Sequence, residues 1–542
     1  MKPGTLFVFF LLFLANSCRN HEAAGEKKIF RYNEAANITS LDPAFARDQA
    51  IIWATNQLFN GLVQLDEGLN IKPCIAYRWD ISDNGLQYTF HLRKDVTFHD
   101  CPAFKDAVGR PVIAQDFIFS FNRLLDPKNG SPGAWIFNYV KNRSGRFDFF
   151  APDDSTLIIG LSQPFPPFLG LLSMQYCSVV PHEALAYFGP EFRRNPIGTG
   201  PFKFKMWKEG VKLVLVKNPR YFEFEKETRL PYLDAVSVIF QPDKQSAFLE
   251  FIKGNLDFMS GIDPSYKDEL LDGQGRLRPK YGVKIELISQ PYLNTEYLGI
   301  LVDPANGSVK NTPFLNKKLR QALNYAFDRH KMIRYLRNNV GTPGIYGITP
   351  KGLPSFDSTL HGYDYNPVKS GKLLAEAGYN EGKNLPALIL TSTSDYLDIC
   401  KYIQHQVSEL GIELKIEVSP PAAVKEMKAQ AKLHFFRASW IADYPDAENY
   451  LSLFYSKNFC PKGPNYTHFN NPEYDRLYEQ SMSTINDSMR YLLYRKMEKI
   501  MMEESPVIIL YYDQVLRFVQ KNITGIGINP MNLLVLKRVK KL

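Results

Sequence analysis

Residues 316–329 read NKKLRQALNYAFDR, and we take this stretch as the starting point for the fold. Asn316 is its first residue, at the position where an Asn side chain accepts a hydrogen bond from the free amides of a first helical turn. The apolar residues recur at the spacing of one helix face: Leu319, Ala322, Leu323, Ala326 and Phe327. The stretch therefore predicts an amphipathic helix that begins after Asn316 and packs one face on a core.

The chain after this helix predicts alternating strands and helices. Residues 388–392 and 412–418 alternate like strands, and residues 397–410 between them have helical spacing that ends at Gly411. Further helices are predicted over 472–482 and 488–502, followed by an apolar strand over 507–512. Strands that alternate with helices are typical of an α/β lobe.

The chain before this helix is richer in strands. Residues 29–32 predict a first strand, and residues 51–60 a helix that stops at Gly61. Short segments alternate like strands around a turn at Asn84-Gly85: residues 76–79, 88–93 and 96–99. Phe117, Phe121, Leu124 and Leu125 then line one face of another helix.

Length and composition indicate a globular protein of more than one lobe. The chain has 542 residues, more than one hydrophobic core normally organises. Hydrophobic residues make up 45% and charged residues 22%. The net charge of +9 is spread over the chain, and the one dense basic run, residues 536–542, reads as a solvated tail. We therefore expect no nucleic-acid partner.

The first residues predict export. Lys2 precedes an apolar run from Leu6 to Ala15, which is too short for a permanent membrane span and has the shape of a signal-peptide core. Asn16-Ser17-Cys18 follows and resembles a bacterial lipobox, with Cys18 as the lipid-modified first residue of the mature protein. The alternative is an ordinary early cysteine in a secreted chain.

Residue patterns give no support for catalysis. The sequence has no HExxH, GxSxG or CxxC pattern, and its nine histidines show no ligand spacing on one helix. His91 and His99 are expected to be structural. Five cysteines remain besides Cys18, an odd number, so at least one thiol is unpaired: Cys74, Cys101, Cys177, Cys400 and Cys460. We expect no enzyme activity, cofactor or metal.

Residues 437–455, RASWIADYPDAENYLSLFY, carry the candidate site. Asp443 follows Trp440 by three residues among mostly apolar neighbours. A carboxylate removed from water is costly unless a cation or several donors meet it. The nearest cation in sequence is Arg437, and the alternative is a positive charge that arrives with a ligand. Asp before Tyr-Pro is also common turn chemistry, so a purely structural role stays open at this point.

Several motifs in order resemble bacterial solute-binding protein family 5, the oligopeptide and dipeptide receptors of ABC importers. They are SLDP at 40–43, YTFHLR at 88–93, GTGPFKF at 198–204 and RQALNYAFDR at 320–329. Cys101 replaces a usual glycine, residues 102–110 look inserted, and Ile113 replaces a usual threonine cap, which removes a side-chain acceptor. The resemblance implies the α/β, two-lobed periplasmic-binding-protein fold of the class II or cluster C type, with an extra N-terminal subdomain and a hinge.

The resemblance also implies a division of the chain. Residues 1–17 are expected to be the signal peptide and 18–28 a lipid-anchored tether. Lobe I would comprise residues 29–60, 190–290 and 506–542, the extra subdomain residues 61–189, and lobe II residues 291–505. The mature protein is expected as a monomeric lipoprotein on the periplasmic side of the cell envelope, with an ABC permease and ATPase as partners.

For the site, the resemblance implies short peptides as ligands. Asp443 would bind the ligand α-ammonium, Trp440 would stack on the peptide, and Tyr444 would support Asp443. Main-chain groups of Ser439 and Ile441 would pair with the ligand backbone, which binds as an added strand in a cleft that closes by hinge motion. Arg47 and Gln49 would offer a second edge from lobe I.

Arg437 matches the position that takes the ligand carboxylate in oligopeptide receptors, and a solvated arginine is the alternative. Relatives also bind nickel complexes, haem and sugars, and a fold does not fix a ligand. A binding protein for a metal chelate, haem or another small solute therefore stays open. So does a signalling or assembly component with the same fold.

Overall fold

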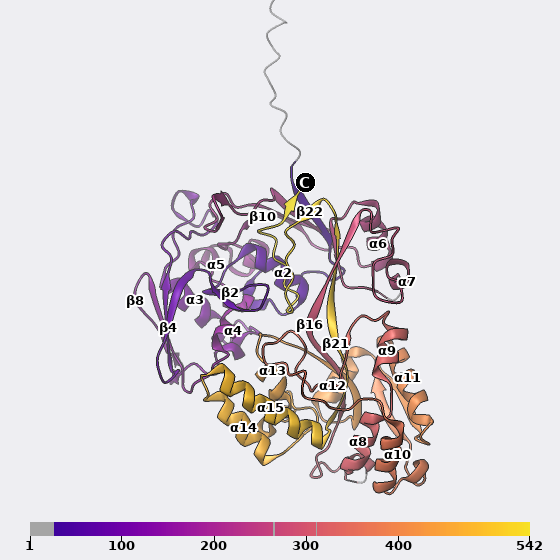
Figure 1. Cartoon of the computed structure of the whole chain (residues 1–542). Coiled ribbons are helices and arrows are strands. Elements are labelled where there is room, and N and C mark those ends of the chain that lie inside the picture. Colours follow the sequence, from indigo (N-terminus) through magenta and orange to yellow (C-terminus); the bar gives the residue numbers. More distant parts are fainter. Residues whose placement is uncertain (1–26, 264–265, 311) are drawn as a thin grey trace, which may run out of the picture.

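The computed structural model describes residues 27–263, 266–310 and 312–542, and the predicted signal peptide and Cys18 lie outside these ranges. Its main element is an 11-stranded sheet that runs through both halves of the molecule (Figure 1). The strands follow in the order β10 (Phe202–Lys208), β11 (Lys212–Lys217), β14 (Ala235–Ile239), β1 (Ile29–Asn33), β15 (Phe258–Ser260), β21 (Val507–Gln520), β16 (Ile285–Ile300), β20 (Phe435–Ile441), β18 (Leu388–Ser392) and β19 (Leu414–Val418), with β17 (Thr342–Pro343) paired to β21. This sheet includes the strands predicted over 29–32, 388–392, 412–418 and 507–512.

Two long strands, β16 and β21, connect the lobes. Their antiparallel pairing runs from Ile285 opposite Gln520 to Gly299 opposite Val507. The register shifts between Pro291 and Thr295, at the crossing between the lobes. Beyond this shift β16 pairs with β20, whereas before it β21 pairs with β15. Irregular pairing in a two-stranded crossing allows bending, so this is the place where a hinge is expected.

Lobe I and the extra subdomain carry a second sheet and short helices. The second sheet has the order β4 (Ala76–Ile81), β5 (Gln87–Leu92), β9 (Thr156–Gly160) and β8 (Phe149–Asp153). The helices are α2 (Gln49–Leu58), α3 (Ala114–Leu125), α4 (Phe168–Leu172), α5 (His182–Phe188), α6 (Lys244–Lys253) and α7 (Lys267–Leu270). A short hairpin of β2 (Val63–Leu65) and β3 (Ile71–Pro73) follows α2 in the sequence and precedes α3. The domain boundaries given above stay predictions. The names lobe I, lobe II and extra subdomain denote the residue ranges given there.

Lobe II is built as the alternation predicts. Its helices are α8 (Lys317–Tyr325), α9 (Arg329–Leu336), α10 (Pro367–Glu376), α11 (Leu397–Ser408), α12 (Pro421–Ala429), α13 (Glu448–Leu451), α14 (Pro472–Met482) and α15 (Asp487–Glu504). The Asn316 side chain accepts from the amide of Lys318, so the predicted cap is confirmed. Leu319, Ala322 and Leu323 are buried, which places the predicted apolar face of α8 in the core. Within the described residues, no helix combines the length and apolar character that crossing a membrane requires.

One local prediction needs correction. Helix α2 ends at Leu58 with Phe59 in an extended conformation, so Gly61 does not end it. At α3, Ile113 is the N-cap residue and forms no side-chain cap hydrogen bond, as predicted. The Asp116 carboxylate accepts from the amide of Ile113 at 2.9 Å. Arg110, at the end of the segment that looks inserted, pairs with Asp116 at 2.7 Å. The insertion therefore brings its own cation to this helix end.

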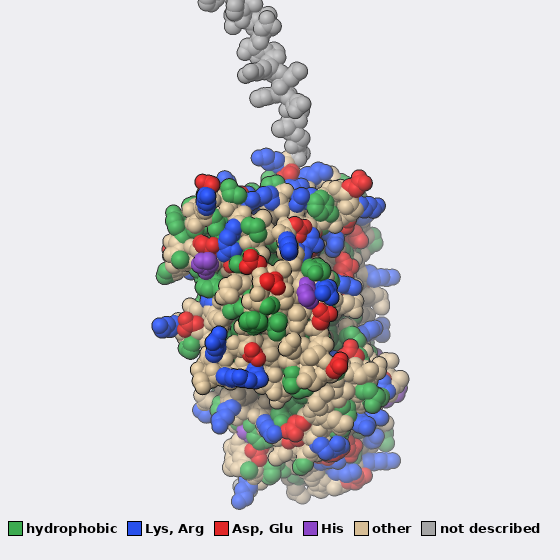
Figure 2. Space-filling view, turned by 90° about the vertical axis from the view of Figure 1, so that its left-hand side faces the viewer, with side chains coloured by type: hydrophobic (Ala, Val, Ile, Leu, Met, Phe, Trp, Pro, Cys, Tyr) green, Lys and Arg blue, Asp and Glu red, His purple; other side chains and the backbone are tan. Residues whose placement is uncertain are grey.

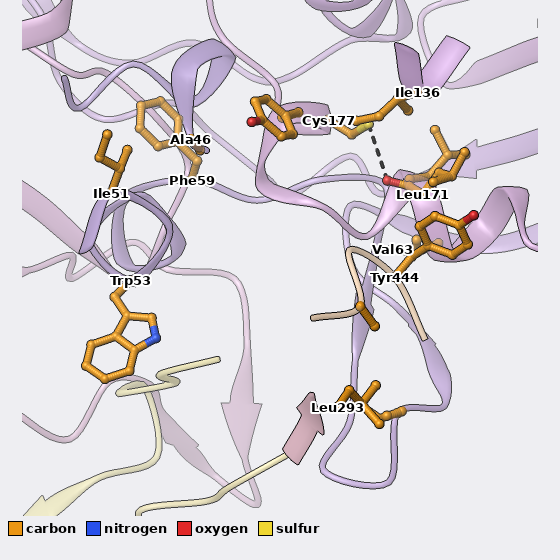
Figure 3. Packing of buried hydrophobic residues seen from close by; sticks show 14 of the residues in the cluster. Ala46, Ile51, Trp53, Phe59, Val63, Ile136, Leu171, Cys177, Leu293 and Tyr444 are labelled. Atoms are coloured by element: carbon orange, nitrogen blue, oxygen red, sulfur yellow. Dashed lines mark hydrogen bonds between the residues drawn. The ribbon is translucent and has the colours of Figure 1, made fainter. Parts of the chain in front are cut away.

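Core packing joins the two lobes. One continuous cluster of buried hydrophobic residues contains Trp53 and Val63 of the N-terminal part together with Leu293 and Tyr444 of lobe II (Figure 3). The lobes are therefore in contact in this conformation. The five described cysteines are all buried and unpaired, as at least one was expected to be. His99 Nε2 lies 3.0 Å from the carbonyl of Gly200, and burial lowers its pKa to about 4, which fits the predicted structural role.

Candidate functional site

Strand β20 positions the predicted segment at the junction of the lobes. Its pairing with β16 places Ser439 opposite Glu296 and Trp440 opposite Thr295. The amide of Ala442 donates to the carbonyl of Leu293 at 3.0 Å. Main-chain groups alternate in direction along a strand, so those of Trp440 and Ala442 face β16.

The opposite edge of β20 is free next to the site. By the same alternation, the main-chain groups of Ser439 and Ile441 point away from β16. The neighbour on that side, β18, pairs with β20 only between Thr391 and Phe436. An extended ligand at Ser439 and Ile441 therefore meets unoccupied main-chain donors and acceptors. This arrangement suits the predicted added strand.

Asn449 holds Trp440 and Asp443 together. Its Oδ1 accepts from the indole Nε1 of Trp440 at 2.7 Å and from the amide of Asp443 at 3.3 Å. Asn449 itself is buried at the start of α13. The stacking ring and the acidic residue are thus fixed to a single side-chain oxygen. The sequence prediction missed Asn449, because a lone Asn six residues after an Asp carries no recognisable signal.

Asp443 is a carboxylate without a cation. Among the described residues, no Lys, Arg or His forms an ion pair with it. Its side chain is exposed, yet loss of hydration raises its pKa, and a hydrogen bond with Asn449 opposes this rise. Solvent reaches the Asp443 carboxylate, and protein surrounds much of it. The carboxylate therefore lies in a recess rather than on a convex surface. Such a site favours a cationic ligand.

Tyr176 of the extra subdomain is influenced by charges of both predicted parts of the site. Burial raises its pKa to about 12, and the negative charges of Asp443 and Asp48 contribute to the rise while Arg47 opposes it. A Cβ atom at Gly133 would lie 2.5 Å from the Tyr176 ring, so the glycine makes room for this ring. Sequence reasoning also missed it.

The loop after Asp443 rests on both lobes. The rings of Trp135 and Tyr444 are 6.2 Å apart, and a Cβ at Gly170 would lie 3.4 Å from Cδ of Pro445. Tyr444 donates to Glu448, as does Tyr478, and burial raises the pKa of Glu448 to about 7. Figure 3 shows Tyr444 close to Leu171 of the extra subdomain. Tyr444 thus anchors the loop that carries Asp443, and its role in a binding site stays a prediction.

Arg437 is engaged within the protein. It forms an ion pair with Glu296 and lies 3.3 Å from the centroid of the Tyr396 ring. Its side chain is only 16% exposed, and its Nε has no hydrogen-bond partner. The solvated arginine considered as an alternative is therefore not what the structure shows. A ligand carboxylate would meet Arg437 together with the opposite charge of Glu296.

A polar network continues from this pair into the crossing of β16 and β21. Asn294 Nδ2 contacts Glu296 at 3.2 Å and Asp513 at 3.3 Å. Asp513 in turn pairs with Arg337 at 2.7 Å. Charged groups with mutual partners are held in register at the point where the strands bend. Motion of one lobe against the other would change these contacts first.

The predicted lobe I edge lies at the start of α2. Arg47 and Asp48 are 68% and 61% exposed and 3.4 Å apart, and Gln49 is also exposed. A cavity of about 590 Å³ lies further along α2, between Asn56 and Lys537, and none of the eight predicted binding residues lines it. We place the site at Asp443 because unpaired polar groups gather there, not because of cavity size.

Comparison with known proteins identifies the family of this chain. The sequence model described as bacterial extracellular solute-binding proteins, family 5, matches residues 70–459. Heme-binding protein A of Haemophilus influenzae is 30% identical over 84% of this chain and 81% of its own length. The glutathione-binding protein GsiB of Escherichia coli K12 is 27% identical over 91% of both chains.

Solved structures show the same fold. HbpA2 of Haemophilus parasuis has a TM-score of 0.81 at 23% identity and covers 95% of this chain and 100% of its own. The periplasmic binding protein DppA of Helicobacter pylori, in complex with the peptide STSA, has a TM-score of 0.72 at 25% identity and covers 94% and 98%. The predicted α/β, two-lobed fold is thereby confirmed. The chain belongs to the bacterial extracellular solute-binding proteins of family 5.

Proposed function

We propose that this protein binds short peptides and delivers them to an ABC importer. The observation that carries the proposal is the uncompensated carboxylate of Asp443 beside the free main-chain edge at Ser439 and Ile441. A peptide has an α-ammonium and a backbone that pairs like a strand, so it complements both features. The DppA structure with the peptide STSA supports a peptide ligand in this fold.

Each predicted residue has a role in this proposal. Asp443 neutralises the α-ammonium, Trp440 covers the first peptide unit, and Asn449 keeps the two in place. Tyr176, Arg47 and Gln49 approach from the other side of the recess. Ligand contacts to both sides favour the conformation in which the lobes meet, and this conformation is the one that a permease would recognise.

The test is a calorimetric titration with tri-alanine and N-acetyl-tri-alanine, on the parent protein and on Asp443→Asn. Acetylation removes the ammonium and leaves the rest of the peptide unchanged. We expect acetylation to weaken binding to the parent protein about 30-fold or more, and to have little effect on the variant. Equal binding of both peptides to the parent would overturn the assignment of Asp443.

The ligand carboxylate has a separate test. We propose that Arg437 binds it through the unpartnered Nε, in competition with Glu296. Amidation of the peptide C-terminus should then weaken binding in the parent protein but not in Arg437→Gln. If the free-acid and amidated peptides bind with identical affinity, Arg437 pairs only with Glu296 and does not bind the ligand carboxylate.

Haem is the second candidate ligand, because the relative with 30% identity is named heme-binding protein A. Haem binding is checked by titration with the Soret absorbance as readout. A saturable shift at stoichiometric haem, with no thermal stabilisation by a peptide mixture, would replace the peptide proposal. A nickel chelate serves as a third arm of the same thermal assay.

We also propose that the mature protein is anchored at Cys18 on the periplasmic side of the envelope and acts as a monomer. A clickable palmitate analogue should label the full-length protein and leave Cys18→Ser unlabelled. The variant should move from the membrane fraction to the soluble fraction. Labelling that persists in Cys18→Ser would place the anchor elsewhere.

A further inference from the structure

A second recess lies on lobe I beside the start of α2. It has a volume of about 210 Å³, and its walls include Glu34, Gln49, Trp53, Phe258 and Tyr266. Gln49 and Trp53 are one turn apart on α2, so this helix forms one wall with Gln49 at its N-terminal end. Gln49 is also part of the proposed lobe I edge, so the recess adjoins the peptide site.

Part of the wall of this recess is apolar. Trp53 and Phe258 are buried, and their ring centroids are 5.9 Å apart with an interplanar angle of 62°. The indole Nε1 of Trp53 donates to the carbonyl of Asn532 at 2.9 Å, so its polar group is satisfied outside the recess. An aliphatic chain would find apolar contact along these rings.

Glu34 supplies an unsatisfied polar group in the same recess. Its Oε1 is buried and has no hydrogen-bond partner. Loss of hydration is the cause that raises its pKa to about 7, with no neighbouring cation to oppose the rise. Lys244, which also lines the recess, is 60% exposed and pairs with Asp263 at 2.9 Å. A buried acceptor without a partner costs free energy until a donor reaches it.

The backbone around Glu34 is held in place. Its amide donates to the carbonyl of Ile239 at 2.9 Å. Asn33 exchanges two side-chain hydrogen bonds with the backbone of Gln241, at 2.8 and 3.1 Å. These contacts fix the backbone that carries Glu34 at the end of β1, beside the recess.

We propose that this recess binds a side chain of the ligand peptide that has an aliphatic stem and a cationic end, that is lysine or arginine, with Glu34 as its counter-ion. The inference rests on the proposed peptide function. The rings accommodate the stem, and the free oxygen of Glu34 receives the charged donor. Peptides with one basic residue at the matching position would be the preferred substrates.

The recess and the proposed peptide site share Gln49, which lines the recess and belongs to the proposed lobe I edge. Successive residues of an extended chain are about 3.3 Å apart. A peptide that lies along this edge therefore has one side chain beside Gln49, where the recess begins.

The experiment uses tripeptides that differ only in the end of one side chain. Lysine and norleucine share the same stem, and norleucine lacks the ammonium. Each is placed in turn at positions 1, 2 and 3 of an alanine tripeptide and titrated calorimetrically at pH 7.5. At one position we expect lysine to bind about 10-fold or more tightly than norleucine. In Glu34→Gln this preference should fall to about 1.

A matched variant separates a specific effect from a change in net charge. Glu227 is exposed, and Glu227→Gln removes the same charge on lobe I outside the recess. It should keep the lysine preference in full. Thermal unfolding of Glu34→Gln without ligand shows whether the variant is folded, and tri-alanine should bind it as it binds the parent.

Proton release gives an independent readout. Free Glu34 is partly protonated near pH 7, and a bound ammonium stabilises its ionised form, so binding releases protons. Calorimetry in phosphate and in Tris should show more protons released with the lysine peptide than with the norleucine peptide. The difference should vanish in Glu34→Gln. A lysine preference that survives Glu34→Gln, or no preference at any position, overturns the inference, whereas absence of all peptide binding overturns the proposed function instead.

Discussion

Asp443 and Asp446 are three residues apart in the same loop and lie in opposite environments. Asp446 is buried, pairs with Arg490 at 3.0 Å and accepts from the hydroxyl of Tyr494 at 2.8 Å. Asp443 is exposed and has no ion-pair partner among the residues described. A carboxylate with all its partners inside the protein contributes to stability, and one without partners is available to a ligand. Residue type alone would not have separated the two.

The largest expected effect is on the stability of the loop. Asp446→Ala leaves the buried Arg490 with Asp487, at 2.8 Å, as its one remaining ion-pair partner among the described residues, so the free energy of unfolding should fall by about 3 kcal/mol. Urea unfolding followed by circular dichroism measures the change. Replacement of Arg490 and Asp446 together by Leu and Ala should cost less than Asp446→Ala alone. If Asp446→Ala is neutral, the proposed contrast between the two aspartates is wrong.

The next effect is on affinity and leaves stability unchanged. Asp443→Asn should weaken peptide binding by about 2 to 5 kcal/mol, because the ammonium loses its counter-ion. Its free energy of unfolding should stay within about 0.5 kcal/mol of the parent value, since no ion pair within the protein is lost. Calorimetry and urea unfolding on the same preparation give both values. If the free energy of unfolding of Asp443→Asn falls strongly, Asp443 has a structural role like that of Asp446.

A smaller effect is expected at Asn449, which connects the site to its support. Asn449→Ala removes the shared acceptor of Trp440 and Asp443, and affinity should fall by about 1 to 2 kcal/mol. Asn449→Asp keeps an oxygen at this position and serves as the matched variant. Its negative charge should raise the pKa of Asp443 further, so its affinity should improve from pH 6 to pH 8 more than that of the parent. Unchanged affinity in Asn449→Ala would show that Trp440 and Asp443 hold their positions without it.

The smallest effect concerns the buried support of the loop at different pH. Burial raises the pKa of Glu448 to about 7, whereas in the unfolded chain its pKa is near the ordinary value of 4.5. The folded protein therefore holds more protons than the unfolded chain between these values, and stability falls as pH rises through 7. From pH 6.5 to 8 this group should account for about 0.8 kcal/mol.

Glu448→Gln tests this pH dependence. In this variant the free energy of unfolding should fall less with rising pH than in the parent protein. The histidines are the same in both proteins, so their contribution cancels in the comparison. Glu498, whose pKa burial also raises to about 7, provides a second variant, Glu498→Gln, with a similar result outside the loop. Unfolding curves at four pH values are the measurement. A parent protein that becomes more stable from pH 6.5 to 8 would contradict the assigned direction.

Much of the local structure was predictable because its causes are local. The spacing of Leu319, Ala322 and Leu323 and the cap at Asn316 define α8 within ten residues of sequence. The end of α2 was mispredicted because its last turn does not use Gly61 and the extended residue Phe59 ends it instead. The contacts of Asp116 with the Ile113 amide and with Arg110 of the apparent insertion were not predictable, because no helix pattern specifies side-chain partners.

The sequence by itself determined the family, the alternation of strands and helices, and the spacing of Trp440 and Asp443, since periodicity and motif order reside in neighbouring residues. Only the tertiary structure decided which charges are neutralised. Glu296 meets Arg437 across 141 positions of sequence because β16 and β20 pair in one register. Oε1 of Glu34 has no hydrogen-bond partner among the described residues. The residues that line its recess come from separate segments of the chain, among them Gln49 and Tyr266. The partner of a charge depends on distance in space, and strand pairing fixes that distance.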